Sequence, residues 1–477
     1  MLEEFIISRI RAELPFEPNE EKEQLFQMLG RYLVSNDPLR AFILSGYAGT
    51  GKTSVVSALV RAMEKLNQPC MLLAPTGRAA KVIARYSERP AYTIHKFIYR
   101  QDQLGVESFS LADNKHVNTL FIVDESSMIS AQRDNASFGS GNLLDDLVQY
   151  VYQGQGCHLM LLGDSAQLPP VGSLQSPALS SDRMAGYGLH VSRFELTQVA
   201  RQALDSGILA EATRIREIIQ NNPSIQSIPN IPNNQNSPII LQADGRDIIR
   251  LQGADVVEQL EQSYREAGEE ETLIITRSNK ATNLYNQGVR ARILWKEDEF
   301  STGDRLMVSK NNYFWTQEYE GIDFLANGDS LEVVRTRNQH EMYGFRFVEA
   351  SLRATDYNWE IDAMVWLDTL FTDTPEQNYR LQQQLFQAIA EDFPEVKNRK
   401  ERTKLIYQSP YYNALQVRFA YAVTCHKAQG GQWRHVYIDS GLTNERVNEL
   451  TQSEREGYLR WLYTALTRST ERIFLLR

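Results

Sequence analysis

The chain has 477 residues, which is more than one hydrophobic core supports, so two to four domains are expected. Its composition, 42% hydrophobic and 23% charged, is that of an ordinary globular protein, and no apolar run approaches the roughly 20 residues of a membrane span. The N-terminus lacks a basic region followed by an apolar segment, so no secretion signal is expected. The net charge of −10 argues against nonspecific nucleic-acid binding by the whole surface, but a local basic groove is compatible with it.

Cysteine usage points to a reducing compartment. The three cysteines, Cys70, Cys157 and Cys425, are widely separated and form no zinc-like pair. They are typical of reduced thiols. We therefore expect a cytoplasmic protein without membrane attachment.

The first part of the chain contains a strand, a glycine-rich loop and a helix in direct succession. A first helix is expected over 18–34, where apolar residues share one face. The apolar run Ala41–Leu44 predicts a buried strand, and Ser54–Leu66 shows apolar residues at helical spacing. Between them lies Gly46–Thr53, with the sequence GYAGTGKT. The order strand, glycine loop, helix is the context of a phosphate-binding P-loop.

Each part of this loop suits a triphosphate. Glycines let backbone N–H groups converge on phosphate oxygens without a Cβ in the way, and the helix N-terminus adds partial positive charge. Lys52 can reach the β- and γ-phosphates, and the Thr53 hydroxyl can hold Mg²⁺. We therefore predict that ATP and Mg²⁺ bind here. The expected nucleotide contacts come from Gly46, Ala48, Gly49, Thr50, Gly51, Lys52 and Thr53.

Two further predicted strands end in residues suited to phosphate chemistry. The strand Thr119–Val123 leads into Asp124 and Glu125, where acidic residues are expected on the Mg²⁺ side of a P-loop site. Asp124 would hold the Mg²⁺ shell, and Glu125 would orient or deprotonate the attacking water. The strand Leu159–Leu162 is followed by Gln167, which could sense a γ-phosphate.

Other segments in this half indicate loops. The strand Met71–Ala74 runs into Pro75, which marks a loop at the ligand-binding edge of a parallel sheet. The segment 97–117 mixes aromatic and polar residues without a helical period, which predicts a small inserted hairpin or loop. Residues 130–142 predict a flexible extension, and 221–238, dense in Asn, Pro and Ser, predicts an irregular loop or linker.

A second α/β pattern begins near Asp255. Strands are predicted at Leu273–Thr276, at Val436–Ile438 and at Ile473–Leu476, which are short apolar runs bounded by polar residues. The chain therefore contains the same architecture twice, without a visible sequence repeat.

The second α/β pattern is interrupted. Short strand-like runs over 297–355 predict a small β insertion. Residues 375–404 are predicted to be helical and charged, with Leu381, Leu385 and Ile389 on the buried face.

The order of the motifs resembles that of superfamily 1 helicases of the RecD/Dda type, the subgroup that moves 5′ to 3′. The resemblance covers most of the chain, from about residue 18 to the end. Its segments are GYAGTGKT at 46–53, APTGRAAK at 74–81, TIH at 93–95, VDESSM at 123–128, GDSAQLPPVG at 163–172, LTQVARQ at 196–202, ITRSNK at 275–280, VTCHKAQG at 423–430 and YTALTR at 463–468.

The resemblance implies roles in hydrolysis beyond the P-loop. Gln167 matches the residue that links the γ-phosphate state to domain closure, and Gly431 is implied in the nucleotide site. Arg201 and Arg468 match two arginine fingers contributed by the second motor domain. A cationic fork that reaches phosphate oxygens only when two domains close makes hydrolysis depend on closure.

One departure from the family concerns the base. The family usually has a glutamine near the start of the first helix that contacts adenine. This chain has Lys22 at the matching place and Gln24 two residues later. Adenine selectivity is therefore open, and GTP is an alternative substrate. The segments 130–142 and 375–404 are longer than the family pattern and have no assigned function, and no nuclease cluster is evident.

The resemblance also implies a track for an unpaired DNA strand. Short hydroxyl, amide and imidazole groups suit such a track, because they bond to phosphate without reading base edges. The matching residues are Pro75, Thr76, Arg78, Thr93 and His95 on the first motor domain, and Asn279, Thr424 and His426 on the second. A structural place in the core is the alternative for both histidines. The family has a duplex-splitting wedge after the TIH motif, where Phe109 could stack on the fork base pair or could instead be buried.

The expected fold is α/β, with two RecA-like parallel-sheet P-loop motor domains. Small β insertions are expected in both, hairpin-like in the first and an SH3-like β barrel in the second. The predicted limits are 1–93 and 119–200 for the first motor domain, 94–118 for the inserted hairpin, 201–330 and 415–477 for the second motor domain, and 331–414 for the β-rich insertion with its helical segment.

The expected function is Mg²⁺-dependent hydrolysis of a nucleoside triphosphate in the cleft between the motor domains. It would drive 5′ to 3′ movement on single-stranded DNA and unwinding of duplex. The expected partners are single-stranded and forked DNA, with repair or recombination proteins as further candidates, and we expect a monomer. The alternatives are a translocase that does not unwind, a regulatory RecD-like subunit of a recombination complex, and an RNA-acting motor of the same superfamily.

Overall fold

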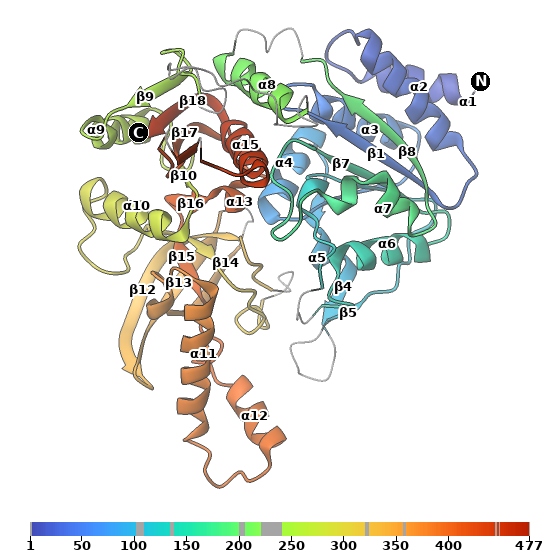
Figure 1. Ribbon diagram of the computed structural model, residues 1–477. Coiled ribbons are helices and arrows are strands. Elements are labelled where there is room, and N and C mark those ends of the chain that lie inside the picture. Colours follow the sequence, from blue (N-terminus) through green and yellow to red (C-terminus); the bar gives the residue numbers. More distant parts are fainter. Residues whose placement is uncertain are drawn as a thin grey trace. The chain divides into compact units, whose positions relative to one another are not determined.

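The computed structural model describes residues 2–101, 109–133, 138–199, 206–220, 241–319, 324–355, 359–443, 446–447 and 449–476. Figure 1 shows the chain coloured from its N-terminus to its C-terminus. The predicted linker at 221–238 lies outside the described residues.

The chain divides into two compact units. Unit 1 comprises Met1–Ile249, Gln429–Gln432 and Leu442–Arg472, and unit 2 comprises Arg250–Ala428, Trp433–Gly441 and Ile473–Arg477. This division differs from the predicted limits, which placed the whole of 201–330 and 415–477 in the second motor domain. Segments of that range pack with unit 1, because the helices α8 and α15 contact each other there.

Unit 1 is built on a six-stranded sheet in the order β3-β2-β6-β7-β1-β8, in which every neighbouring pair is parallel. β6 and β7 are buried along their whole length, as expected for parallel strands covered on both faces. The strands predicted in this half of the chain are all present. The bounds are β1 (Arg40–Gly46), β2 (Cys70–Ala74), β3 (Ala91–Thr93), β6 (Leu120–Val123), β7 (His158–Gly163) and β8 (His190–Leu196).

The helices of unit 1 surround this sheet. Those named here are α1 (Leu2–Ala12), α2 (Glu20–Val34), α3 (Lys52–Lys65), α4 (Gly77–Ser87), α5 (Ile94–Ile98), α6 (Leu143–Gln153), α7 (Ser181–Ala185), α8 (Gly207–Gln220) and α15 (Gln452–Leu466), with 3-10 turns η1 (Ser126–Met128) and η2 (Pro177–Leu179). Several begin with a side-chain cap; for example, the Asn19 side chain accepts a hydrogen bond from the Lys22 amide at the start of α2.

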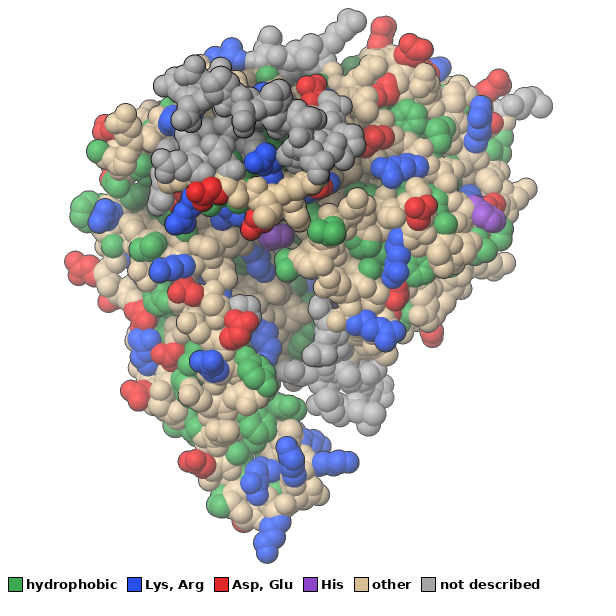
Figure 2. All heavy atoms as spheres, in the orientation of Figure 1, with side chains coloured by type: hydrophobic (Ala, Val, Ile, Leu, Met, Phe, Trp, Pro, Cys, Tyr) green, Lys and Arg blue, Asp and Glu red, His purple; other side chains and the backbone are tan. Residues whose placement is uncertain are grey.

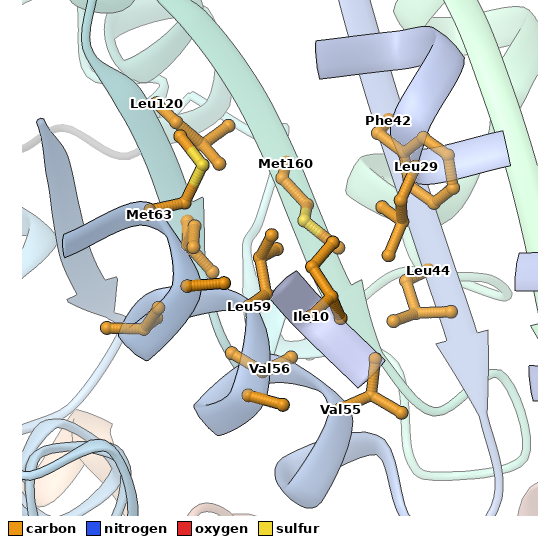
Figure 3. Close-up of a cluster of buried hydrophobic side chains, with 14 of the residues drawn as sticks. Ile10, Leu29, Phe42, Leu44, Val55, Val56, Leu59, Met63, Leu120 and Met160 are labelled. Atoms are coloured by element: carbon orange, nitrogen blue, oxygen red, sulfur yellow. The ribbon is translucent and has the colours of Figure 1, made fainter. Parts of the chain in front are cut away.

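The core of unit 1 joins the N-terminal helices to the sheet. Figure 3 shows Ile10 of α1 pointing toward Leu59 of α3 and Met160 of β7. Leu29 of α2 and Phe42 of β1 belong to the same buried cluster. α1, which was not predicted, is therefore part of the same core as the P-loop helix.

A small hairpin interrupts unit 1 where the insertion was predicted. β4 (Tyr99–Gln101) pairs antiparallel with β5 (Phe109–Leu111). The connecting residues 102–108 lie outside the described part of the chain. Of the predicted extension 130–142, residues 134–137 also lie outside it, and Asn142 caps α6 by accepting bonds from two backbone amides.

Unit 2 contains a second sheet, in the order β16-β10-β17-β18-β9. β10 is parallel to both of its neighbours, as the neighbouring strands of the unit 1 sheet are. Together the two parallel arrangements confirm the predicted pair of RecA-like folds. The elements are β9 (Ile248–Leu251), α9 (Asp255–Glu266), β10 (Thr272–Thr276), α10 (Asn279–Arg292), β16 (Ala422–Thr424), α13 (Cys425–Ala428), β17 (Trp433–Asp439) and β18 (Ser469–Leu476).

The insertion in unit 2 is a five-stranded antiparallel sheet in the order β14-β13-β12-β11-β15. Its strands are β11 (Arg305–Val308), β12 (Ser330–Met342), β13 (Phe345–Ala354), β14 (Glu360–Trp366) and β15 (Val417–Phe419). A bridge between Val365 of β14 and Leu415, just before β15, links the two edge strands, which is consistent with the predicted small barrel. The sheet extends past the predicted limits 331–414 at both ends, because β11 and β15 pair with each other.

Two helices extend the antiparallel sheet, where one charged helical segment was predicted. They are α11 (Pro375–Ala390) and α12 (Arg399–Tyr407), and the 3-10 turn η5 (Leu367–Thr369) precedes them. Leu385 and Ile389 are buried and Leu381 is partly buried, which confirms the predicted apolar face of this segment. Among the described residues, no helix combines the length and the apolar character that crossing a membrane requires.

The packing of α1 predicts a difference between two positions on one helix. Ile10 is fully buried, whereas Leu2 is 63% exposed. Ile10→Ala removes buried methyl groups from the shared core, so we expect it to lower the free energy of unfolding of unit 1 by about 2–5 kcal/mol. The matched control Leu2→Ala should change it by less than about 0.5 kcal/mol. Urea unfolding followed by intrinsic fluorescence measures both, and equal effects would contradict the docking of α1.

Candidate nucleotide and nucleic-acid site

The P-loop connects β1 to α3. Gly49 and Gly51 adopt left-handed backbone angles, with φ of +76° and +86°, which side chains other than glycine rarely tolerate. Gly51 is the N-cap of α3 and offers no side-chain cap, so the first amides of the helix are free of a capping side chain. The Lys52 ammonium donates to the carbonyl oxygens of Gly46 and Tyr47, the latter at 3.1 Å. The loop therefore holds Lys52 at the helix N-terminus.

The acidic pair follows β6, which is separated from β1 by β7 in the sheet. The Glu125 amide donates to Asp124 Oδ1 at 2.8 Å. Glu125 has a φ of +49°, which costs about 1–3 kcal/mol for a non-glycine residue and is typical of functional sites. Burial raises the pKa of Asp124 above its usual range, and the Lys52 ammonium opposes that rise.

Glu125 lies close to Arg468. Their atoms Oε1 and Nη1 are 3.9 Å apart. Burial raises the pKa of Glu125, and the Arg468 guanidinium is the strongest influence that opposes this rise. A carboxyl group whose pKa is moved toward neutrality is suited to general base catalysis.

Arg468 itself is almost fully buried, at 4% exposure. Its Nε donates to the Thr464 carbonyl at 3.1 Å, and its Nη1 donates to the Gly431 carbonyl at 3.2 Å. These bonds keep the guanidinium at the mouth of the P-loop pocket. Arg201 lies outside the described residues.

Gln167 follows β7 and is also buried, at 7% exposure. Its side-chain oxygen has no hydrogen-bond partner within the described ranges. The next residue, Leu168, is fixed on both sides, because its amide donates to Thr464 Oγ1 and its carbonyl accepts from Gln429, each at 2.8 Å. An unpartnered buried amide oxygen at this position is available to a ligand.

These elements line one pocket of about 660 Å³, formed by residues of unit 1. The predicted nucleotide and catalytic residues that line it are Ala48, Gly49, Gly51, Lys52, Thr53, Asp124, Glu125, Gln167, Gly431 and Arg468. Glycines without Cβ atoms, uncapped helix amides and two carboxyl groups match the chemistry of a triphosphate with its Mg²⁺.

The other residues predicted to contact the nucleotide are not among those that line this pocket. Thr50 is buried and donates to the Tyr47 carbonyl at 2.7 Å, so it shapes the loop. Gln24 is exposed on α2 and does not line the pocket. Lys22 is 3% exposed and lies beside the loop: a Cβ on Gly51 would be 3.4 Å from Lys22 Cε. Burial lowers the pKa of Lys22.

The predicted DNA contacts of unit 1 lie where β2 and β3 end, and these two strands are neighbours. Pro75 and Thr76 follow β2, and Thr76 caps α4 by accepting from the Ala79 amide at 3.2 Å. Arg78 donates to the Gln432 carbonyl at 3.4 Å. Thr93 ends β3 and is buried, and it caps α5. The structure therefore brings these residues to one edge of the sheet.

His95 and Phe109 belong to an aromatic cluster. The His95 ring packs edge-on against Phe138, and burial lowers its pKa to about 4, so the imidazole is neutral at pH 7. Phe109 is 5% exposed and its ring stacks on Phe138, with centroids 4.8 Å apart. The prediction that Phe109 stacks on a base is therefore at odds with the structure, because the ring is already covered by another aromatic side chain.

In unit 2 the predicted DNA contacts also lie at strand ends. Asn279 begins α10 just after β10, and Thr424 ends β16, which neighbours β10 in parallel register. Asn279 donates its amide to the Asp373 carbonyl at 2.9 Å. His426 follows in α13, half-buried, and burial lowers its pKa. The two units thus place their polar loop residues at corresponding edges.

Tyr463 and Asp164 had no predicted role. The Ala48 amide of the P-loop donates to the Tyr463 hydroxyl at 3.0 Å, and this hydroxyl donates to Asp164 Oδ2 at 2.7 Å. Three predicted motifs are therefore joined by two hydrogen bonds. Both residues stand inside those motifs, but their pairing depends on how α15 packs against unit 1, which no local pattern encodes.

Taken together, the strand–loop–helix geometry, the acidic pair and the buried arginine define a P-loop nucleoside triphosphatase. Comparisons with known proteins refine this class. The family model of an AAA domain matches residues 27–220, and that of a UvrD-like helicase C-terminal domain matches residues 419–476.

Individual relatives are also helicases. The ATP-dependent DNA helicase dda of Enterobacteria phage T4 is 23% identical over 457 residues, covering 90% of this chain and 93% of that protein. The ATP-dependent RecD2 DNA helicase of Deinococcus radiodurans is 30% identical over 199 residues, covering 40% of this chain and 23% of that protein. A solved structure of Pif1 helicase from Bacteroides in complex with ADP-AlF3 and ssDNA is 15% identical, with a TM-score of 0.48, and covers 96% of this chain and 92% of that one. Together with the ordered motifs, these matches support a superfamily 1B helicase.

Proposed function

We propose that the protein is an ATP-dependent DNA helicase that moves 5′ to 3′ on single-stranded DNA and separates duplex. The observation that supports this most is the pocket in which the P-loop, the acidic pair and Arg468 come together. The two helicase relatives act on DNA according to their names, and Dda matches nearly the whole chain. The proposed direction is that of the helicase subgroup that the ordered motifs resemble.

In this proposal each pocket residue has a part in hydrolysis. The P-loop amides and Lys52 bind the phosphates and orient the γ-phosphate. Glu125 accepts the proton of the attacking water at its carboxylate, and Arg468 stabilises the charge that develops on the phosphate oxygens. Gln167 reports the γ-phosphate state to the rest of the protein. Arg201 would act as a second finger.

Thr53 and Asp124 would hold Mg²⁺. The Thr53 side chain is exposed at the start of α3, and Asp124 lies beside Lys52 in the same pocket. When bound, the ion supplies charge neutralisation for the phosphates.

For the nucleic acid, we propose a track along the strand ends of both units. Thr76 and Thr424 would offer hydroxyl groups to phosphates, and Pro75, Arg78, Thr93, His95, Asn279 and His426 complete the proposed set. Because such contacts read no base edges, binding should be independent of sequence. We further propose that the protein works in the cytoplasm as a monomer, alone or with repair and recombination proteins.

A strand-displacement assay tests this function most directly. The unmodified protein with ATP and Mg²⁺ should displace a strand from a duplex with a 5′ single-stranded tail and not from one with a 3′ tail. Lys52→Ala should abolish displacement and DNA-stimulated hydrolysis, because the triphosphate loses its cation. Hydrolysis without displacement on either substrate would favour the non-unwinding translocase, activity on RNA tails only would favour the RNA motor, and absence of hydrolysis would favour a regulatory subunit.

Arg468→Ala should separate binding from turnover. The guanidinium is proposed to act on the transition state, so hydrolysis should fall by about 1,000-fold or more while affinity for a fluorescent ATP analogue stays within a few-fold of the wild-type value. Arg468→Lys should not restore the rate, because an ammonium lacks the planar fork. Loss of nucleotide binding in parallel with turnover would contradict the finger role.

The position of Lys22 leads to a prediction about whether the nucleotide site prefers adenine or guanine. Its side chain lies beside Gly51, with Nζ 5.7 Å from the centre of the Phe16 ring. An ammonium only donates hydrogen bonds, so it suits O6 and N7 of guanine, whereas a glutamine amide matches the donor and acceptor of adenine. We expect appreciable GTP hydrolysis by the unmodified protein.

Lys22→Gln should accordingly raise the ratio of kcat/KM for ATP over GTP by about fivefold or more. Gln24→Ala is the matched control, since Gln24 is exposed on the same helix and should leave the ratio unchanged. An unchanged ratio in Lys22→Gln would remove Lys22 from base recognition.

A further inference from the structure

The helices α11 and α12 form a helical arm, defined here as residues 375–407, which extends from the antiparallel sheet of unit 2 (Figure 1). Its inner face is apolar. Leu385 and Ile389 of α11 and Ile406 of α12 are buried in one cluster with Phe347 and Trp366 of the sheet. The arm is therefore a packed part of unit 2, and it presents its outer side chains from a fixed base.

Local hydrogen bonds stabilise the start of both helices of the arm. Thr374 and Gln377 form a reciprocal capping box at the start of α11. Asn398 caps α12, and Arg402 donates through Nε and Nη2 to the Val396 carbonyl, at 3.0 and 2.6 Å. Arg402 is thus used to close the turn between the helices.

The remaining cations of α12 and of the turn that precedes it are exposed. None of their side chains has a hydrogen bond or an ion pair within the described residues. Figure 2 shows Lys and Arg side chains gathered at the lower end of the view, where Figure 1 labels α12. We call these residues the basic stripe: Lys397, Arg399, Lys400 and Lys404.

Residues of the basic stripe are placed unfavourably for the stability of α12. Arg399 and Lys400 stand in the first turn, where the helix dipole disfavours cations. Lys400 and Lys404 are four residues apart, so like charges face each other on one side of the helix. Glu401 is the only acidic residue of α12, and it is paired with none of them. These exposed cations are therefore available to an anionic ligand.

We propose that the basic stripe binds the phosphate backbone of duplex DNA, in addition to the single-strand track. This inference rests on the proposed helicase function. Unpaired lysines and arginines neutralise phosphates without reading sequence. Duplex DNA presents the densest row of phosphates, with one charge per ~1.7 Å of its axis, and therefore gains most from a short row of point charges. The arm then binds the paired region of a fork.

The test compares two double charge reversals in unit 2. Lys400→Glu with Lys404→Glu alters the basic stripe. Arg265→Glu with Arg292→Glu is the matched control, because both arginines are exposed on helices and have no ion pair among the described residues. Affinity for a labelled blunt duplex and for a single strand of equal length is measured over a range of NaCl concentrations, together with hydrolysis stimulated by the single strand.

The stripe variant should bind duplex several-fold more weakly than wild type, and the slope of log K against log salt should become shallower by about 2. Its single-strand affinity and its stimulated hydrolysis should equal those of wild type. If the glutamate variant unfolds, Lys400→Gln with Lys404→Gln should give a smaller loss of the same kind. Duplex binding equal to that of the control, or an equal loss on single strands, would overturn the proposal. Unwinding by the wild-type protein, measured alongside, tells this outcome apart from a failure of the helicase function.

Discussion

Four charged side chains, Lys52, Asp124, Glu125 and Arg468, line the P-loop pocket, and the proposed chemistry of the site depends on this concentration of charge. Each carboxyl group has its pKa raised by burial, and a neighbouring cation opposes that rise. Partly buried charges of this kind contribute little to stability, because desolvation offsets their attraction. Their concentration in one pocket instead suits phosphoryl transfer, in which charge that develops on the phosphate oxygens must be stabilised.

In a parallel sheet the carboxyl ends of the strands lie at the same edge, so loops from distant parts of the chain come together there. In unit 1 the P-loop follows β1, the acidic pair follows β6 and Gln167 follows β7, so three strand ends contribute to one pocket. The proposed DNA residues follow β2 and β3 of the same sheet. In unit 2 the same rule places Asn279 after β10 and Thr424 at the end of β16. The apolar strands hold these loops, which leaves the loop residues free for polar ligands.

Much of this was predictable from sequence, because apolar strands followed by glycine, acidic or hydroxyl residues are local signals. α1 was missed, since its buried face is completed only by contact with α2 and α3. The burial of Phe109 depends on Phe138, nearly 30 residues away in the chain, and no local pattern records that contact. Tyr463 likewise reaches the Ala48 amide only through the packing of α15. Long-range packing, and not local secondary-structure propensity, therefore accounts for these differences between the predictions and the structure.

In the proposed mechanism, a single pocket for a triphosphate is coupled to an unpaired strand of DNA. Steady-state hydrolysis of ATP by the unmodified protein, measured with and without saturating single-stranded DNA in the presence of Mg²⁺, tests that coupling most directly. The strand should raise the turnover rate many-fold. An equal rate in both conditions would show that hydrolysis is independent of the DNA strand, and would contradict the proposed coupling.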